Sequence, residues 1–178
     1  MSLTQNLREV MKAISGVPGF DKVLEKVTLV SAAPGKVTCE LRVQEEHTNK
    51  LGTLHGGLTA TLVDSISTMA LLCTERALPG VSVDMNITYM SPAKIGEVVV
   101  ITAQILKQGR TLAFASVDLT NKTTGKLVPR IKPCRFPISQ TAPPQKDQVH
   151  KLLSPSCSPT AYAMLSILDL MLRLSRTA

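Results

Sequence analysis

The sequence predicts an α+β fold in which one long helix is followed by a meander of antiparallel strands. In residues 55–76, apolar side chains recur every three or four positions, which is the spacing of one buried helix face. Residues 81–89 then alternate strictly between apolar and polar side chains, as in a half-buried strand. Two further strand patterns, 97–106 and 111–120, each follow a turn sequence. We therefore expect one helix packed against a sheet.

The residues before the long helix predict a second helix and a hairpin. Apolar residues recur at helical spacing in 3–15, and a Gly/Pro turn stops them. Residues 21–29 favour a short helix that leads into a strand. The strand patterns 27–31 and 36–43 flank the turn sequence 32–35, which indicates a hairpin.

The composition changes after Val128, where a last strand has only begun. Seven of the eleven prolines lie in residues 129–159, and proline is excluded from central strands. We therefore expect this strand to fail, with at most partial pairing over 128–139. The predicted organisation is a domain over 1–128, a Pro-rich linker or disordered segment over 129–159, and a short hydrophobic helix or tail over 160–178. The extension is expected to be largely irregular.

The distribution of charge argues against nucleic-acid binding. The net charge is +7, but residues 1–128 carry 13 Lys and Arg against 11 Asp and Glu. Most of the excess positive charge therefore follows residue 128. The sequence has no Trp and few other aromatic residues, which argues against stacking on single-stranded nucleic acid.

Metal sites and membrane spans are not expected either. The four cysteines form no C-x-x-C pair and have no histidine nearby at zinc-ligand spacing. No segment reaches the ~20 apolar residues that a transmembrane helix needs. The sequence thus predicts a globular domain with no metal and no membrane span.

The run from Asn49 to Asp64 carries most of the chemical information. His55, Gly56 and Gly57 stand at the predicted helix start, where free N–H groups and the helix dipole suit a developing oxyanion. Asp64 lies on a face of small residues in an otherwise apolar helix, which is costly unless the carboxylate has a partner or a task. An exposed Asp on an outer helix face is the alternative. The run suggests hydrolysis of an activated carbonyl.

Helix geometry separates the two chemical groups of this run. Gly56 and Asp64 are eight residues apart, which corresponds to about 12 Å of rise and directions that differ by about 80°. One helix can hardly present both to the same carbonyl. We therefore expect Asp64 to come from an opposing subunit.

Three separated segments, 49–64, 81–93 and 106–111, resemble the hotdog-fold acyl-coenzyme A thioesterases in sequence and in order. The resemblance implies a long central helix wrapped by an antiparallel sheet, and subunits joined edge to edge as a homodimer or homotetramer with shared sites. It also implies hydrolysis of medium- and long-chain fatty acyl-coenzyme A, without a cofactor. A cytoplasmic location is expected, with the mitochondrion as a second compartment.

The resemblance assigns roles to five residues. The backbone N–H of Gly56 would bind the thioester carbonyl, with Asn49 assisting. Asp64 would act as general base or as nucleophile, and Ser82 would orient the water. His55 is kept as a supporting residue that caps the helix or orders the loop. A purely structural role remains the alternative for each of these residues. Asparagine often caps turns, so Asn49 could do the same. Ser82 could face solvent, as a serine in a strand usually does, and the two glycines could serve a tight turn.

The resemblance also implies that two strand–turn segments line the coenzyme A site. By charge, Lys94, Lys107 and Arg110 are candidates for the phosphates, although solvated turn charges are the ordinary reading. The full set of expected coenzyme A residues is Asp84, Tyr89, Met90, Ser91, Pro92, Ala93, Lys94, Lys107, Gln108, Gly109, Arg110, Thr111 and Leu112.

The family continues past Val128 with a final strand, whereas this chain carries the Pro-rich segment. Three hypotheses result. The chain is a working thioesterase, or a catalytically impaired variant that serves as a hotdog subunit or acyl-coenzyme A binder. The third hypothesis, an acyl hydratase, is weak because no acid–base histidine is evident near Asp64.

Overall fold

The computed structural model describes residues 2–16, 18–77 and 80–137, the last nine of these through their backbone. The predicted extensions over 138–159 and 160–178 lie outside the described residues. The elements in chain order are α1 (Leu3–Ser15), η1 (Phe20–Leu24), β1 (Thr28–Ala33), β2 (Lys36–Arg42), η2 (Glu45–His47), α2 (Gly56–Leu72), β3 (Gly80–Tyr89), β4 (Val98–Gln108), β5 (Ala113–Asn121) and β6 (Leu127–Pro137).

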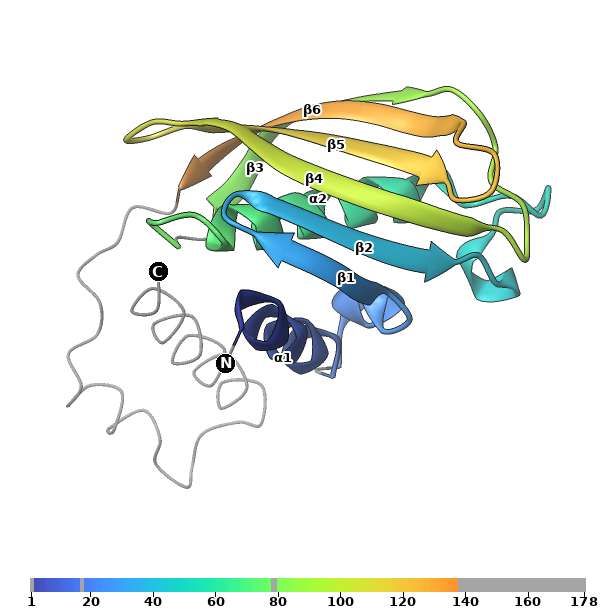
Figure 1. Cartoon of the computed structure of the whole chain (residues 1–178). Coiled ribbons are helices and arrows are strands. Elements are labelled where there is room, and N and C mark those ends of the chain that lie inside the picture. The colour runs from blue at the N-terminus through green and yellow to red at the C-terminus, as the bar shows by residue number, and fades with distance from the viewer. Residues whose placement is uncertain (1, 17, 78–79, 138–178) are drawn as a thin grey trace.

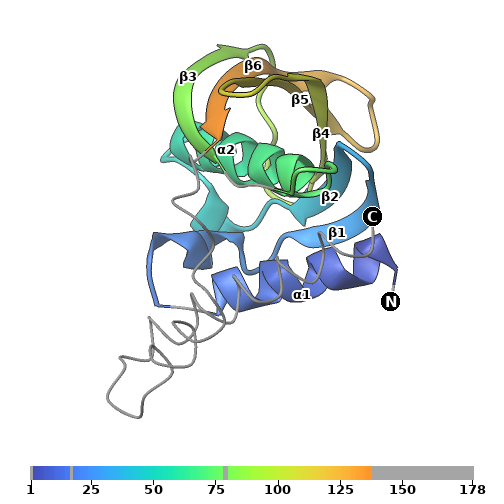
Figure 2. The same ribbon diagram turned by 90° about the vertical axis from the view of Figure 1, so that its left-hand side faces the viewer.

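The strands form one antiparallel sheet of six, in the order β1-β2-β4-β5-β6-β3. The sheet curls around α2, so that β3 and β2 lie on either side of the helix (Figures 1 and 2). The predicted α+β hotdog fold, with a long helix wrapped by an antiparallel sheet, is confirmed. The predicted hairpin of β1 and β2 is present as well, and Gly35 provides the positive φ of 67° in its turn.

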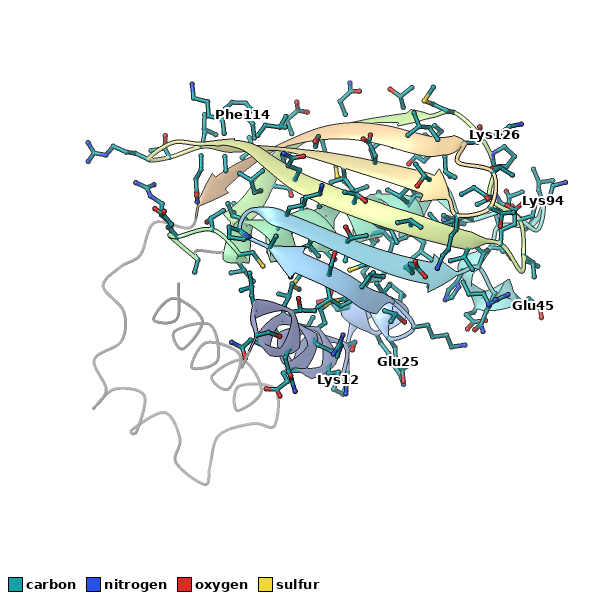
Figure 3. All side chains as sticks on the ribbon, in the orientation of Figure 1. Lys12, Glu25, Glu45, Lys94, Phe114 and Lys126 are labelled. Carbon is teal, nitrogen blue, oxygen red and sulfur yellow. The ribbon has the colours of Figure 1, made fainter. Side chains whose placement is uncertain are left out.

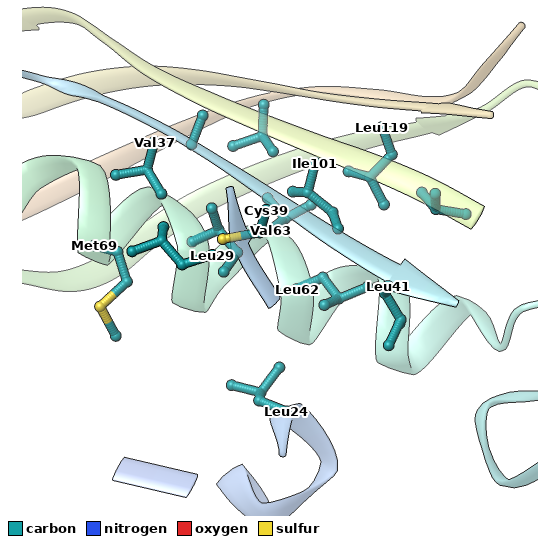
Figure 4. Packing of buried hydrophobic residues seen from close by; sticks show 14 of the residues in the cluster. Leu24, Leu29, Val37, Cys39, Leu41, Leu62, Val63, Met69, Ile101 and Leu119 are labelled. Atoms are coloured by element: carbon teal, nitrogen blue, oxygen red, sulfur yellow. The ribbon is translucent and has the colours of Figure 1, made fainter. Parts of the chain in front are cut away.

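The core lies between α2 and the concave face of the sheet. Leu62, Ile66 and Met69 are buried as the apolar stripe predicts. They share one cluster with side chains that point inward from the strands, among them Val37, Leu41, Ile101 and Leu119 (Figure 4). Because the sheet surrounds the helix on several sides, α2 also buries residues outside the stripe, including Val63 and Ala70. The packing fixes the helix along its whole length.

Helix α1 covers β1 and closes the other side of the core. Its buried residues are Leu7 and Val10, and the hydroxyl of Thr4 accepts the N–H of Ala32 in β1 at 3.2 Å. Figure 2 shows α1 lying across the lower edge of the domain, below β1. No helix within the described residues is long and apolar enough to cross a membrane.

Strand β6 corrects the expectation that the last strand fails after Val128. It runs to Pro137 and lies between β5 and β3, so the predicted domain boundary at 128 falls inside a strand. Its pairing with β3 is continuous from Tyr89–Pro129 to Asp84–Cys134.

The spacing of the prolines explains why β6 tolerates them. In an antiparallel strand, successive residues direct their N–H and C=O groups to opposite neighbours. Pro129, Pro133 and Pro137 are four residues apart, so all their missing donors face the same side. In the described pairing with β5, Arg130, Ile131 and Cys134 have partners and the prolines have none. The loss of hydrogen-bond donors is thus confined to the pairing of β6 with β5.

Strand β3 is one of the two edges of the sheet. Seven of its ten residues are exposed and the other three are partly buried. The exposed residues include two apolar valines, Val81 at 57% and Val83 at 51% exposure. An apolar, unpaired strand edge is a template for pairing with another chain.

Candidate active site

The N-terminus of α2 presents a backbone donor. His55 is the N-cap, and its Nδ1 accepts the N–H of Gly57 at 2.9 Å. The carbonyl of His55 accepts the N–H of Thr59 at 2.9 Å. Among the hydrogen bonds of the described residues, none occupies the N–H of Gly56. The first N–H of the helix is therefore available to an acceptor at the positive end of the helix dipole.

The loop before the helix is organised by Asn49. Its Oδ1 accepts the N–H of Leu51 at 2.8 Å, and its Nδ2 donates to Thr53 Oγ1 at 3.0 Å. The turn-capping reading of Asn49 is thus observed in this chain. An amide nitrogen carries two hydrogens, so a second donor remains beside the turn. The N–H of Leu54 donates to the carbonyl of Ala93 at 2.8 Å, which links this loop to the segment between β3 and β4.

An open groove of about 650 Å³ lies at this end of the helix. It brings the predicted catalytic residues Asn49 and Gly56 together with the predicted coenzyme A segment that follows β3. The groove is lined by Asn49, Leu54, Gly56, Gly57, Thr59, Tyr89, Met90, Ser91, Pro92, Ala93 and Val128. We call this region, with the Gly56 N–H, the donor half-site.

A carboxylate and a hydroxyl meet farther along the helix. Asp64 is half-buried on α2, and the hydroxyl of Ser82 in the edge strand β3 donates to its Oδ1. The carbonyl of Asp64 accepts the hydroxyl of Thr68 at 2.8 Å. The Asp64 side chain is therefore partnered, as a carboxylate in an apolar helix requires. We call this pair the carboxylate half-site.

The two half-sites are separate within one chain. Neither Asp64 nor Ser82 is among the described residues that line the groove. Both half-sites are built on the same helix, where eight residues correspond to about 12 Å of rise. The chain therefore holds the predicted catalytic residues in two separate places.

The predicted coenzyme A segments are also separated. Ala93 is bonded to Leu54 at the start of α2, whereas the carbonyl of Gly109 accepts Arg76 Nη1 at 2.7 Å beyond the end of α2. The 17-residue helix spans about 25 Å between them. Figure 3 shows the same separation, with Lys94 and Phe114 near opposite ends of the sheet. Segments 89–94 and 107–112 do not meet within one chain.

The charged side chains of these segments are exposed, and one buried side-chain donor lacks a hydrogen-bond partner among the described residues. Lys94, Lys107 and Arg110 are exposed, as is Asp84 on the edge strand. Gln108 Nε2 is buried without a hydrogen-bond partner among the described residues, so a donor is available beside the turn between β4 and β5. The N–H of Gly109 donates to the carbonyl of Leu112 at 2.7 Å and closes that turn.

Comparison with known proteins identifies the family of this fold and site. Residues 51–128 match the model of the thioesterase superfamily. The chain is 84% identical to acyl-coenzyme A thioesterase 13 of Mus musculus over 127 residues, which are 71% of this chain and 91% of that protein. The chain belongs to the thioesterase superfamily. The expected resemblance is thereby confirmed, and the family match ends at Val128, directly before the Pro-rich segment.

Solved structures of thioesterases have the same fold as this chain. Thioesterase superfamily member 2 of Mus musculus is 76% identical, with a TM-score of 0.71 over 76% of this chain and 98% of that one. A hypothetical thioesterase of Streptococcus pneumoniae, solved with coenzyme A, is 29% identical, with a TM-score of 0.61 over 66% of this chain and 90% of that one.

Two of the cysteines of this thioesterase lie in its core. The thiols of Cys39 and Cys73 are buried, and desolvation raises the pKa of Cys39 to about 12 and that of Cys73 to about 11. A buried, protonated thiol is a poor nucleophile. Among the described residues, no group of three His, Cys, Asp or Glu side chains could hold a metal ion.

Two structural contacts of the site have no signal in the sequence. His47 is buried, with 4% of its surface exposed. Its carbonyl accepts the N–H of His55 at 2.9 Å, which anchors the start of the helix. The hydroxyl of Tyr89 donates to the carbonyl of Gly56 at 3.1 Å. Both contacts join residues that are distant in the chain or separated by an irregular loop, so neither periodicity nor motif spacing reveals them.

Proposed function

We propose that this thioesterase hydrolyses fatty acyl-coenzyme A to free fatty acid and coenzyme A, with medium and long acyl chains preferred. The observation that carries the proposal is the unoccupied N–H of Gly56, which opens into a groove lined by Asn49 and residues 89–93. The names of the relatives support a coenzyme A thioester as the substrate.

In the proposed reaction, the thioester carbonyl oxygen accepts the N–H of Gly56. Charge that develops on this oxygen is stabilised by the backbone donor and by the helix N-terminus. The carboxylate of Asp64 removes a proton from a water held beside Ser82, and the resulting hydroxide attacks the carbonyl carbon. The carbon–sulfur bond then breaks, and the proton passes to the departing thiolate.

Nucleophilic attack by Asp64 itself is the second route. Single-turnover hydrolysis in ¹⁸O-water detects this route when water attacks the Asp64 carbonyl of the mixed anhydride, because the label then enters the Asp64 carboxylate. General-base catalysis, and attack of water on the acyl carbonyl of the anhydride, both place the label in the fatty acid.

The assembly that we propose is a homodimer joined through β3, with dimers pairing into a tetramer. The Tyr89 end of β3 contacts the start of α2, and its Ser82 end contacts Asp64. If two β3 strands pair antiparallel about a twofold axis, the Ser82 end of one lies beside the Tyr89 end of the other. Each carboxylate half-site would then face the donor half-site of the partner.

The proposed activity is tested by measuring release of the coenzyme A thiol from acyl-coenzyme A of increasing chain length, from butyryl to palmitoyl. We expect turnover that rises toward the longer chains and that falls about a thousandfold in Asp64→Asn. Equal turnover in Asp64→Asn would overturn the proposed role of Asp64. Coenzyme A binding without any turnover would favour the catalytically impaired alternative.

The shared site is tested by mixing subunits. Asp64→Asn and Gly56→Pro subunits are each expected to be nearly inactive alone. After unfolding and reassembly together, half of the dimers are mixed, and each mixed dimer has one intact site, so about one quarter of wild-type activity returns. Sites contained within one chain would give no recovery.

A further inference from the structure

The peptide group between Gly56 and Gly57 is held from both sides. Its carbonyl oxygen, on Gly56, accepts the hydroxyl of Tyr89 at 3.1 Å. Its N–H, on Gly57, donates to Nδ1 of His55 at 2.9 Å. The plane of this peptide is therefore fixed by one side chain from β3 and one from the loop before the helix.

The neighbouring peptide group contains the N–H of Gly56, the donor of the proposed reaction. Its carbonyl, on His55, accepts the N–H of Thr59 at 2.9 Å. Gly56 and Gly57 form the start of α2, and because glycine has few steric limits on φ and ψ, the orientation of these planes depends on their hydrogen bonds. With both flanking groups bonded, the direction of the Gly56 N–H is set before substrate arrives.

Tyr89 is itself well placed to impose this restraint. Its ring lies against Gly56, since a Cβ built on that residue would be 3.6 Å from the ring. The backbone at Tyr89 pairs with Pro129 of β6. The next residue, Met90, donates its N–H to the carbonyl of Val128 at 2.8 Å. The hydroxyl of Tyr89 therefore reaches Gly56 from a backbone that is anchored in the sheet.

We propose that Tyr89 is a positioning residue for the oxyanion donor, and that it acts by orienting the Gly56–Gly57 peptide rather than by contacting coenzyme A alone. The inference rests on the proposed function, because it takes the N–H of Gly56 to be the donor. It also gives β3 a second task, since the strand that carries Ser82 to Asp64 carries Tyr89 to Gly56.

The kinetic test uses Tyr89→Phe in the full chain, which keeps the ring and removes only the hydroxyl. A misdirected donor weakens binding of the transition state and leaves ground-state binding intact, so kcat is expected to fall about tenfold. The KM for acyl-coenzyme A and the Kd for free coenzyme A are expected to change less than about twofold. Thr88→Val, which removes the neighbouring exposed hydroxyl of the same strand, is the matched control and is expected to behave as wild type.

A structural test observes the peptide directly. In protein labelled with ¹⁵N-glycine, which has ten glycines to resolve, the Gly57 amide resonance reports on the hydrogen bond to the adjoining carbonyl of Gly56. Tyr89→Phe should shift this resonance with an unchanged melting temperature, and Thr88→Val should not.

Either of two results would overturn the inference. The first is an increase in KM and in the Kd of coenzyme A at unchanged kcat, which would make Tyr89 a coenzyme A contact only. The second is a Gly57 resonance and kcat that both stay at wild-type values. Failure of the proposed function is seen separately, as absence of Asp64-dependent turnover in the wild-type chain.

Discussion

The donor and carboxylate half-sites lie on one helix but are built from different parts of the chain. The donor half-site uses backbone groups of two glycines, restrained by Tyr89 and His55. The carboxylate half-site uses two side chains, Asp64 and Ser82, which meet at the edge of the sheet. A backbone donor tolerates a change of side chain and fails when the N–H is removed, whereas a side-chain pair fails when a single functional group is removed.

Among the further substitutions that test one half-site without the other, Gly56→Pro is expected to lower kcat the most. Proline is well tolerated at the first position of a helix, and His55 already has the extended conformation, φ −65° and ψ 132°, that a residue before proline needs. The variant should fold and lose only the donor, which lowers kcat by about 10² to 10³.

Gly56→Ala is the matched control for that variant. It keeps the N–H, and its Cβ would lie 3.6 Å from the Tyr89 ring, an ordinary contact. We expect kcat to fall less than about fivefold. Steady-state kinetics on both variants decides the point, and equal losses would show that space rather than the donor matters at this position.

A smaller effect is expected from Ser82→Ala in the carboxylate half-site. The substitution removes a hydrogen bond to a carboxylate, an interaction that contributes about 1.5–3 kcal/mol. We expect kcat to fall about tenfold to a hundredfold, with little change in the Kd of coenzyme A. Calorimetric titration with coenzyme A checks the second part. A loss confined to binding would remove Ser82 from the reaction.

His55→Ala is expected to lower stability as well as kcat, because the imidazole both caps α2 and restrains the Gly56–Gly57 peptide. The imidazole caps α2 through the N–H of Gly57, and loss of an N-cap costs about 1 kcal/mol of the free energy of unfolding. His55→Asn should recover most of this loss, because asparagine is a favoured N-cap. Urea denaturation measures both variants. An Asn variant as unstable as the Ala variant would argue against capping as the role of His55.

The smallest effect is expected at the two buried cysteines, which lie outside both half-sites. Burial raises the pKa of Cys39 to about 12 and of Cys73 to about 11. The thiolate is the reactive form, and it accumulates only as the pH rises toward these values, so iodoacetamide should leave both thiols unlabelled in the folded protein at pH 8. Peptide mass mapping reads out each cysteine separately. Rapid labelling of either thiol would show that the core opens locally.

Much of the fold could be predicted because it depends on local periodicity. The stripe through Leu62 and Ile66 and the alternation of residues 81–89 gave the long helix and the edge strand in their places. The last strand could not be predicted from composition. Proline content alone argues against β6, whereas the spacing of the prolines makes their missing donors face β5 only.

The candidate site shows the same division. Gly56, Asp64 and Ser82 were predicted from motifs that resemble those of thioesterases, and the structure brings Ser82 to Asp64. The bond from Tyr89 to Gly56 spans 33 residues of sequence, and no local pattern encodes a contact of that kind.

By itself, the sequence determined most of the elements before Val128, the residue types of the half-sites and their separation along one helix, because helical rise and side-chain periodicity are local properties. Only the tertiary structure decided which groups meet. The curl of the sheet around α2 brings both ends of β3 onto the helix. The same arrangement leaves the two predicted coenzyme A segments a helix length apart. Long-range packing and strand pairing set these relations, and they join residues whose separation along the chain carries no signal.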